Sequence, residues 1–380
     1  MGMVGGGEGA FVGRIHRMAA ALDGEIELVC GAFSQDPGNA RRSGLALHLS
    51  DKRIYTDFRD MMSAEAALPL HERMQFVSIV TPNHLHFPVA EAALIAGFHV
   101  LSEKPATISL EEALKLRTIV SETGLLYGLT HTYTGYPLIK EARVRVVAGQ
   151  IGAIRKVVVE YPQGWLAELE ENAENKQAAW RLDPAQAGPS GCMGDIGVHA
   201  ANLAEYVTGL NITEICADLN RVVPGRELDD DGSVLLRFEG GAKGLLYASQ
   251  VSLGEENNLV IRVYGETGGL TWRQQEPNTL WLMWHDHPAE MLRTGSAYLS
   301  ELASANVRAP MGHPEGYLEA FANLYMAFAG KIRAREAGKD EDLRAADCPG
   351  IEEAVRGMAF IERVVEASAS ELKWHPFDRP

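Results

Sequence analysis

Short apolar runs alternate with helical patterns in the first third of the chain, and this alternation constrains the fold more than any other feature. The apolar runs cover residues 25–33, 74–82, 98–105 and 125–133. Helical patterns lie between them, at residues 11–22, 88–97 and 109–124. Continuous apolar strands separated by helices predict a parallel sheet that is covered by helices on both faces.

After about Tyr136 the pattern changes. A helical pattern over residues 136–149 precedes a strand pattern over 156–164 and a second helical pattern over 194–209. Six strand-like runs follow with turns and no helix between them, at residues 214–219, 233–238, 243–251, 258–265, 269–274 and 279–284. Such a succession predicts a large, mainly antiparallel sheet. Two long helical patterns, at 315–338 and 350–368, close the chain.

We therefore expect an α/β protein of two domains. A doubly wound parallel sheet would occupy residues 1–133, and a second α/β domain with the antiparallel sheet would occupy residues 134–380. The boundary is a change of architecture, since no linker rich in Gly and Ser separates the two parts. Only four residues precede the first glycine run, so we leave open whether the natural chain begins further upstream.

Composition and charge argue against several kinds of partner. The 380 residues are 46% hydrophobic and carry a formal net charge of −16, which disfavours binding to nucleic acid or to an anionic membrane. No apolar run approaches the length of a membrane span, and the N-terminus lacks the features of a signal peptide. The cysteines are scattered, at positions 30, 192, 216 and 348, so no disulfide framework is indicated. We expect a soluble, cytoplasmic protein.

The stretch "GGGEGAFVGRIH", residues 5–16, lies between a predicted strand and a predicted helix. Gly5, Gly7 and Ala10 fit the dinucleotide pattern G-x-G-x-x-G/A, and a second register uses Gly7, Gly9 and Gly13 with one extra residue. Glycines in such a loop allow backbone amides to approach a pyrophosphate at a helix N-terminus. Taken alone the signal is weak, because glycine-rich turns are common.

The end of the second predicted strand bears on the choice of dinucleotide. An acidic residue there usually binds the adenosine ribose, but this chain has Ser34, with Asp36 two residues later. Arg41 and Arg42 are near enough in sequence to read a 2′-phosphate, and a solvated helix start explains them equally well. The sequence leaves NAD and NADP open at this point.

Three further segments carry polar side chains suited to chemistry. "TPNHLH" and "SEKP" follow two predicted parallel strands, at the edge of the sheet where open α/β sheets bind ligands. "SEKP" places Glu103 and Lys104 before a proline whose peptide bond could be cis. "GDIGVH" places Asp195 and His199 four residues apart, on one face of a predicted helix. Taken singly, a surface lysine, a helix cap and a buried histidine explain the same residues.

Taken together, these segments resemble the glucose–fructose oxidoreductase and inositol dehydrogenase (Gfo/Idh/MocA) family over essentially the whole chain. The glycine loop, "TPN..H", "EKP", "WR" and "GDIG.H" carry the resemblance, with the late antiparallel sheet. It implies an N-terminal Rossmann domain, a C-terminal α/β domain with a large open sheet, and an NAD(P)-dependent dehydrogenase. Its substrate would be a secondary alcohol of a sugar, glycoside or cyclitol, and its cofactor NAD, with NADP left open.

The resemblance also implies roles for individual residues. His199 would take the hydroxyl proton, Lys104 would donate to the same oxygen, and Asp195 would orient the substrate or the imidazole. The cofactor would contact the glycine loop, the region after the second strand, the "TPN..H" and "EKP" segments and the "WR" pair. These residues are Gly5, Gly7, Glu8, Gly9, Ala10, Phe11, Ser34, Arg41, Thr81, Pro82, Asn83, His86, Glu103, Lys104, Trp180 and Arg181. We expect the Glu8 carboxylate to point away from the pyrophosphate, with the amides of residues 7–11 facing it.

A narrower resemblance rests on the lengthened glycine loop, Ser34, "HTYTGYP", "YPQGW" and "GHPEGYLEAF". These features look like the branch of the family that includes levoglucosan dehydrogenase, which implies NAD and oxidation of a pyranose at its 3-hydroxyl. We expect Tyr133, Gln163, Trp165 and His313 to contact the sugar, together with Lys104, Asp195 and His199. Core packing is the alternative for Tyr133 and Trp165.

Other functions remain in competition with this one. The same fold is used by a non-catalytic dinucleotide-binding regulator and by an aldose–aldose oxidoreductase that does not release its cofactor. His285 and His287 lack a third ligand at a recognisable spacing, so we expect no metal site. The acidic segment 168–176 is a candidate lid. The open face of the second sheet needs a cover, which predicts a homodimer or homotetramer.

Overall fold

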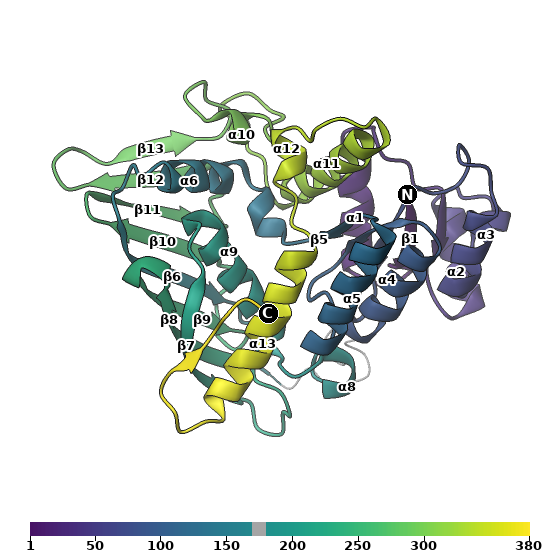
Figure 1. Cartoon of the computed structure of the whole chain (residues 1–380). Helices are drawn as coiled ribbons and strands as arrows, with labels where there is room; N and C mark the ends of the chain where they lie inside the picture. Colours follow the sequence, from purple (N-terminus) through teal and green to yellow (C-terminus); the bar gives the residue numbers. More distant parts are fainter. Residues whose placement is uncertain (169–179) are drawn as a thin grey trace. The chain divides into compact units, whose positions relative to one another are not determined.

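The computed structural model describes residues 1–168 and 180–380, so the candidate lid lies, apart from Glu168, outside the described residues. The chain divides into two compact units (Figure 1). Unit 1 contains Met1–Thr130 and Phe321–Val355, and unit 2 contains His131–Ala320 and Arg356–Pro380. A single boundary near residue 133 does not anticipate that residues 321–355 pack with the first unit.

Unit 1 is built on a parallel sheet of five strands in the order β2-β1-β3-β4-β5, within the described residues. The strands are β1 (Gly2–Gly5), β2 (Cys30–Ala32), β3 (Phe76–Val80), β4 (His99–Ser102) and β5 (Tyr127–Leu129). The predicted parallel sheet is confirmed. The predicted strand over 25–33 shortens to three residues, which pair with residues 2–4 of β1.

Helices pack on both faces of this sheet, as the apolar pattern predicts. They are α1 (Val12–Ala21), α2 (Pro37–Ala46), α3 (Phe58–Ala66), α4 (His86–Ile95), α5 (Leu110–Thr123), α12 (Leu343–Ala346) and parts of α11 (Tyr317–Glu336) and α13 (Ile351–Ser368). Val77 and Ile79 of β3 belong to the core that α3, α4 and α5 complete. Phe76, on the opposite face of β3, contacts Phe328 of α11 with ring centroids 5.4 Å apart.

Unit 2 is built on a sheet of nine strands within the described residues, in the order β13-β12-β11-β10-β6-β9-β8-β7-β14 (Figure 1). The strands are β6 (Ile154–Pro162), β7 (Ile212–Asn220), β8 (Asp231–Phe238), β9 (Lys243–Ser249), β10 (Val260–Gly265), β11 (Gly268–Arg273), β12 (Thr279–Trp284), β13 (Glu290–Arg293) and β14 (His375–Pro376). Neighbouring strands are antiparallel except β6 and β9, which are parallel. The predicted large, mainly antiparallel sheet is confirmed.

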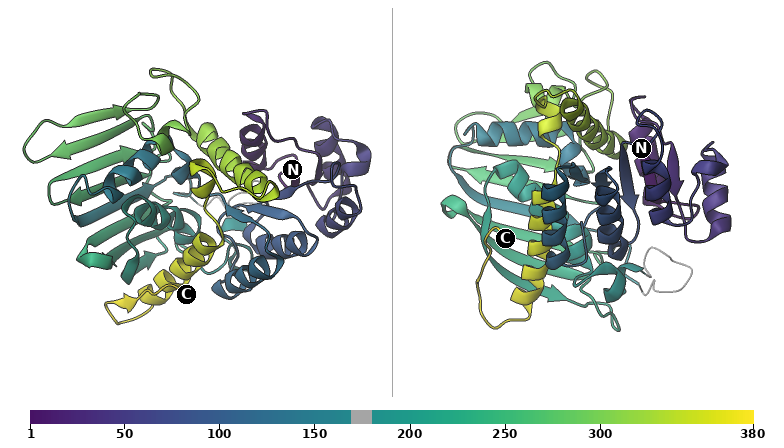
Figure 2. Two further views of the ribbon diagram at one scale, coloured as in Figure 1. Left: turned by 45° about the horizontal axis from the view of Figure 1, so that its top comes forward. Right: turned by 45° about the vertical axis from the view of Figure 1, so that its right-hand side comes forward.

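One face of this sheet carries helices (Figure 2). They include α6 (Pro137–Val147), which contacts β11 and β12, and α9 (Val198–Thr208), which contacts β6, β9 and β10. Val157, Val159 and Tyr161 of β6 are buried, whereas the residues between them are partly exposed on the opposite face. Shorter elements of the unit are α8 (Pro184–Ala187) and α10 (Glu301–Ser304).

Across residues 1–168 and 180–380, no helix combines the length and apolar character that crossing a membrane requires.

Candidate functional site

The glycine loop connects β1 to α1. Gly5, Gly6 and Gly9 adopt positive φ angles of 84°, 74° and 86°, a conformation that favours glycine. Gly13, in the first turn of α1, packs directly on Gly6, since a Cβ on Gly13 would lie 2.4 Å from the Gly6 Cα. Gly13 therefore has the role of the third fingerprint glycine, which permits close packing of the helix on the strand. The two glycine patterns read from the sequence therefore belong to one lengthened loop between β1 and α1.

Several amides of this loop are already hydrogen-bonded within unit 1. The Gly7 amide donates to the Phe33 carbonyl at 3.2 Å, and the Ala10 amide donates to the Gly7 carbonyl at 3.0 Å. The Glu8 amide donates to Ser43 Oγ at 2.8 Å. In the described chain the amides of Gly9 and Phe11 have no acceptor, and no side chain of the N-cap residue caps the start of α1. These amides, with the helix N-terminus, could hold a phosphate.

The polar groups near the end of β2 are also engaged. The Glu8 carboxylate accepts from Arg42 Nε at 3.1 Å, and Arg41 pairs with Asp51 at 2.8 Å. Asp36 caps α2 by accepting from the amides of residues 38 and 39. Ser34 Oγ accepts from the Asp36 amide at 3.1 Å. Both arginines that suggested a 2′-phosphate site therefore have a carboxylate partner.

The segment after β3 offers a buried polar atom to a ligand. Thr81 Oγ1 is buried and has no hydrogen-bond partner in the part of the chain that the structure describes. A Cβ on Gly5 would lie 3.0 Å from Thr81 Cγ2, so this hydroxyl lies beside the glycine loop. Pro82 then leads into a 3-10 turn that begins at Asn83, whose side chain is buried. An unsatisfied buried hydroxyl beside open loop amides fits a bound dinucleotide.

His86 connects this segment to the one after β4. Its Nδ1 lies 2.6 Å from the Pro105 carbonyl oxygen, and its Nε2 lies 2.9 Å from the Thr81 carbonyl oxygen. Burial lowers the pKa of His86, although both carbonyl contacts act to raise it. The ring is almost completely buried. These contacts connect the two segments through the His86 ring, and the contact of His86 with the cofactor stays a prediction.

Glu103 and Lys104 follow β4, and the Lys104–Pro105 peptide is cis. The Glu103 carboxylate accepts from His16 Nε2 at 2.9 Å and from the Thr130 hydroxyl. Burial raises the pKa of Glu103, but the hydrogen bond and charge of His16, with the charge of Lys104 and the Thr130 hydroxyl, bring it below its ordinary value. An ionised carboxylate, hydrogen-bonded to His16 and Thr130, therefore lies directly before Lys104.

Sequence reasoning missed the network behind Glu103. His16 Nδ1 lies 2.8 Å from the Tyr325 hydroxyl, and that hydroxyl lies 2.7 Å from Ser78 Oγ. His16 is fully buried in α1, three residues after Gly13. The spacing from Gly13 was the available signal, because it places a polar ring on the helix face that packs on the sheet.

Asp195 and His199 belong to unit 2. The predicted helix over 194–209 begins as a π-helical turn, Met193–Gly197, in which the Val198 amide donates to the Met193 carbonyl. The Asp229 carboxylate accepts from the amides of Gly191 and Met193, both at 2.9 Å, and so anchors this turn. π-Turns occur often at functional sites.

The Asp195 carboxylate is held by two side chains. Gln250 Nε2 donates to Oδ2 at 2.9 Å, and Arg181 Nε lies 3.4 Å from the same oxygen. The Arg181 guanidinium stacks over the Trp180 ring at 4.2 Å and lies 5.9 Å from the Trp165 ring centroid. The predicted "WR" pair therefore lies beside the predicted Asp195.

His199 is almost completely buried against two aromatic rings. Its ring centroid lies 5.0 Å from that of Tyr133 and 5.5 Å from that of His131, edge to face in both cases. Trp165 Nε1 donates to Gln163 Oε1 at 2.9 Å. Gln163 in turn donates to Asn257 at 2.6 Å.

These contacts form what we call the unit 2 cluster. It contains the predicted Tyr133, Gln163, Trp165, Trp180, Arg181, Asp195 and His199, and the residues His131, Tyr161, Gln250 and Asn257, which the sequence reasoning missed. Tyr161 lies in the quoted "YPQGW" stretch. Gln250 and Asn257 lie in a polar connection between two strands, where nothing in the sequence distinguishes them from solvated loop residues.

His313 does not join the cluster. It lies in an exposed turn, where its Nδ1 is 3.2 Å from the Pro310 carbonyl oxygen. No contact with a cluster residue is found for it within the described ranges. His287 stacks on Trp284 and lies 2.7 Å from Asp286.

Comparison with known proteins matches both parts of the chain to one family. Residues 1–131 match the model of the "oxidoreductase family, NAD-binding Rossmann fold", and residues 139–271 match that of the "GFO/IDH/MocA C-terminal domain". The oxidoreductase YfiI of Bacillus subtilis is 32% identical over 99% of this chain and 96% of its own. Levoglucosan dehydrogenase of Pseudarthrobacter phenanthrenivorans is 26% identical over 74% of this chain and 75% of its own.

A solved structure agrees with these matches. An inositol dehydrogenase homologue from Azotobacter vinelandii, complexed with NAD+, superposes with a TM-score of 0.94. It is 38% identical, and the superposition covers 99% of this chain and 96% of that one.

Proposed function

Because this chain belongs to the Gfo/Idh/MocA oxidoreductase family and carries its NAD-binding Rossmann domain, we propose that it is an NAD-dependent dehydrogenase of a polyhydroxylated ring. The substrate is a sugar, glycoside, anhydrosugar or inositol, oxidised or formed at a secondary alcohol. We propose the 3-hydroxyl of a pyranose as one reacting position, and the levoglucosan dehydrogenase likeness favours an anhydrosugar among the substrates. The inositol dehydrogenase likeness favours a cyclitol.

The observation that carries this proposal is the unit 2 cluster. Aromatic rings such as Trp165 and Tyr133 suit the C–H faces of a sugar ring, and the amide of Gln163 and the carboxylate of Asp195 suit its hydroxyls. The Tyr133 ring lies edge to face with the buried imidazole of His199, with the ring centroids 5.0 Å apart. A site of few polar groups fixed on an apolar wall is typical of small-molecule binding.

Bound NAD would supply the acceptor for the hydride. The groups that would hold it are the Gly9 and Phe11 amides, the N-terminus of α1 and the Thr81 hydroxyl, with Ser34, Pro82 and Asn83 nearby in unit 1. In this proposal His86 positions the two segments, and Trp180 with Arg181 shields the reacting face of the cofactor.

In the proposed reaction His199 takes the proton of the substrate hydroxyl, since a neutral imidazole is a suitable base near pH 7. Lys104 donates a hydrogen bond to the same oxygen and stabilises the charge that develops there as the hydride leaves. Asp195, held by Gln250 and Arg181, orients a neighbouring hydroxyl.

Two other functions compete with this one. A dinucleotide-binding regulator would need no base beside its ligand site, so the buried His199 in a polar cluster favours the enzyme. An aldose–aldose oxidoreductase would retain its cofactor, and protein purified with a nicotinamide absorbance would support it. The test is NADH absorbance, at about 340 nm, with a panel of inositols, glucosides and anhydrosugars. Cofactor binding without turnover on any of them would support the regulator.

We also propose that the chain forms a homo-oligomer through the uncovered face of the nine-stranded sheet. Large apolar side chains are exposed at 40–49% on the strands of that sheet: Leu235, Tyr264, Trp281 and Met291. Trp281 and Met291 are cross-strand neighbours, and exposed apolar surface of this kind is typical of an interaction site.

A further inference from the structure

Asn257 connects three side chains of the unit 2 cluster. It lies in the segment that joins β9 to β10, which also carries Gln250, the hydrogen-bond partner of Asp195. Asn257 Oδ1 accepts from the Tyr161 hydroxyl at 2.8 Å and from Gln163 Nε2 at 2.6 Å. Its Nδ2 donates to the Tyr133 oxygen at 3.3 Å. One amide therefore contacts three residues from η3 (Thr132–Gly135), β6 and the strand end beyond it.

The donors and acceptors of these bonds form a closed ring. The proton of Tyr161 goes to Asn257, so in the contact between the two phenols Tyr161 accepts and Tyr133 donates. Asn257 then returns a hydrogen bond to Tyr133. Each phenol has one proton, and in this ring both protons are used inside the protein. Hydrogen bonds in such a ring strengthen one another.

The ring determines what Tyr133 can offer to another molecule. Because its proton is committed to Tyr161, any further hydrogen bond at the Tyr133 oxygen is one that this oxygen accepts. Gln163 is oriented in the same way, since its Oε1 accepts from Trp165 and its Nε2 donates to Asn257. The Tyr133 ring lies edge to face with His199, so the same bonds fix the aromatic ring beside the proposed base.

We infer that Asn257 is a positioning residue that sets substrate specificity: by closing the ring with Tyr133 and Tyr161, it makes Tyr133 an acceptor for a substrate hydroxyl. The substrate class that fits is a ring with a free hydroxyl next to the reacting carbon. An ether or a carbonyl oxygen in that place has no proton to donate. The inference rests on the proposed function, because it concerns the substrate of the same cluster.

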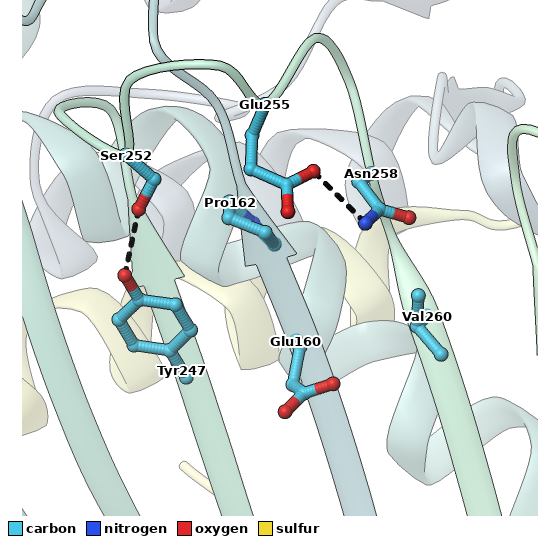
Figure 3. A pocket seen from close by; sticks show the side chains of 7 residues that line it. All are labelled: Glu160, Pro162, Tyr247, Ser252, Glu255, Asn258 and Val260. Atoms are coloured by element: carbon cyan, nitrogen blue, oxygen red, sulfur yellow. Dashed lines mark hydrogen bonds between the residues drawn. The ribbon is translucent and has the colours of Figure 1, made fainter.

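The test uses three variants of the full-length protein and one matched control. Asn257→Ala removes all three bonds, and Tyr161→Phe opens the ring while Asn257 keeps Gln163 in place. Asn257→Asp replaces the donor with an ionisable acceptor of the same size. The control is Asn258→Ala, because Asn258 donates to Glu255 at 3.0 Å and lines a separate pocket with Glu160 and Tyr247 (Figure 3). Glu160 precedes Tyr161 in β6, so the two side chains lie on opposite faces of the sheet.

The readouts are KM and kcat for myo-inositol and levoglucosan with NAD+. The Kd of NADH shows whether the cofactor site of each variant is correctly folded. We expect Asn257→Ala to raise KM about five- to thirtyfold, as loss of hydrogen bonds to an uncharged substrate does. The kcat should change less than KM. The NADH Kd of every variant, and all constants of Asn258→Ala, should stay near those of the wild type.

The pH dependence of Asn257→Asp separates positioning from a general loss of structure. A protonated aspartic acid donates to Tyr133 as the amide does, and an aspartate does not. The ratio of the variant KM to the wild-type KM should therefore fall as the pH is lowered from about 8.5 to about 5.5, toward the protonation range of a buried carboxyl. The titratable groups that face Asn257 are Tyr161, whose pKa burial raises, Tyr133 and, behind it, His199. Both proteins contain them, so their effects cancel in the ratio.

The outcomes distinguish the two proposals. A wild-type protein that oxidises neither polyol contradicts the proposed function and the inference with it. An active wild type with an unchanged KM in Asn257→Ala and Tyr161→Phe contradicts the inference alone. A raised KM whose ratio in Asn257→Asp is independent of pH also contradicts it, since the donor to Tyr133 would then not matter.

Discussion

Gly13 and Gly6 are in direct backbone contact, so that a methyl group on Gly13 would lie 2.4 Å from the Gly6 α-carbon. This contact sets how closely the N-terminus of α1 approaches the end of β1. The loop amides that we propose for phosphate binding lie between the two glycines. The contact therefore connects the packing of unit 1 with its capacity to bind a dinucleotide.

Gly13→Ala should weaken NADH binding and lower stability. The new methyl meets backbone atoms, which cannot move aside as a side chain can, and overpacking of this kind costs about 1–3 kcal/mol. Fluorescence titration with NADH and thermal unfolding measure the two effects. Gly316→Ala is the control, because its Cβ would meet no atom nearer than 3.9 Å. Wild-type binding and stability in Gly13→Ala would show that the contact is not needed.

Glu8→Gln should increase the use of NADP relative to NAD. The substitution releases Arg42 from its carboxylate partner and removes a negative charge beside it, and both changes favour a 2′-phosphate. The pair is about two-thirds exposed, so stability should change little. We expect the ratio of kcat/KM for NADP to that for NAD to rise about three- to tenfold. The surface control Glu72→Gln should leave this ratio unchanged. An unchanged ratio in Glu8→Gln would show that Arg42 does not contact the cofactor.

Lys104→Ala and His199→Ala should each lower kcat by about two to four orders of magnitude. The loss follows from removing the donor to the developing oxyanion in one case and the base in the other. NADH titration should show that both variants still bind cofactor. Lys115→Ala and His71→Ala are matched controls, since both side chains are at least 60% exposed. Near-normal turnover in either active-site variant would refute the assigned role.

His99 should contribute to the loss of stability in mild acid. Burial and the charge of Arg335 lower its pKa from 6.5 to about 4, and its Nδ1 accepts from the Leu126 amide at 3.0 Å. Between these pKa values the unfolded chain takes up a proton that the folded chain does not, so stability falls as the pH is lowered. His99→Gln should lose less of its midpoint temperature between about pH 7 and about pH 5 than the wild type. An equal or larger loss would contradict the assignment.

Trp281→Glu should dissociate the proposed homo-oligomer. The side chain is 42% exposed on the uncovered sheet face, and a charge there would be buried without a partner in an interface. Light scattering coupled to gel filtration would show a smaller mass than for the wild type. Leu372→Glu, at a residue that is 71% exposed near the C-terminus, is the control. A monomeric wild type would end this proposal.

The sequence predicted the architecture because strand and helix patterns are local. Continuous apolar runs identified β3 and β4, and the six runs after residue 212 correspond to β7–β12. The predicted helix over 109–124 begins with a local cap, in which Ser109 Oγ accepts from the Glu112 amide and the Glu112 carboxylate accepts from the Ile108 amide, both at 3.2 Å. Strand ends were less predictable. The length of β2 depends on β1, and the short β13 and β14 exist only because β12 and β7 offer edges to pair with.

The candidate site was predictable where a sequence motif indicates it, and it was not predictable where it depends on contacts between residues distant in sequence. Asp195 and His199 follow from their spacing. Asn257 and His16 do not, because their roles depend on Tyr133 and Glu103, which are distant in sequence. The sugar contact of His313 stays a prediction, and the structure describes that side chain in an exposed turn.

The most direct test of this account is the formation of NADH by the purified wild-type chain and by His199→Ala with myo-inositol, levoglucosan and a set of glucosides. We expect absorbance at about 340 nm to rise with at least one of these polyols in the wild type. The rate should be lower by about two to four orders of magnitude in His199→Ala at equal NADH affinity. A wild type that binds NADH and reduces NAD+ with none of these polyols would contradict the central claim.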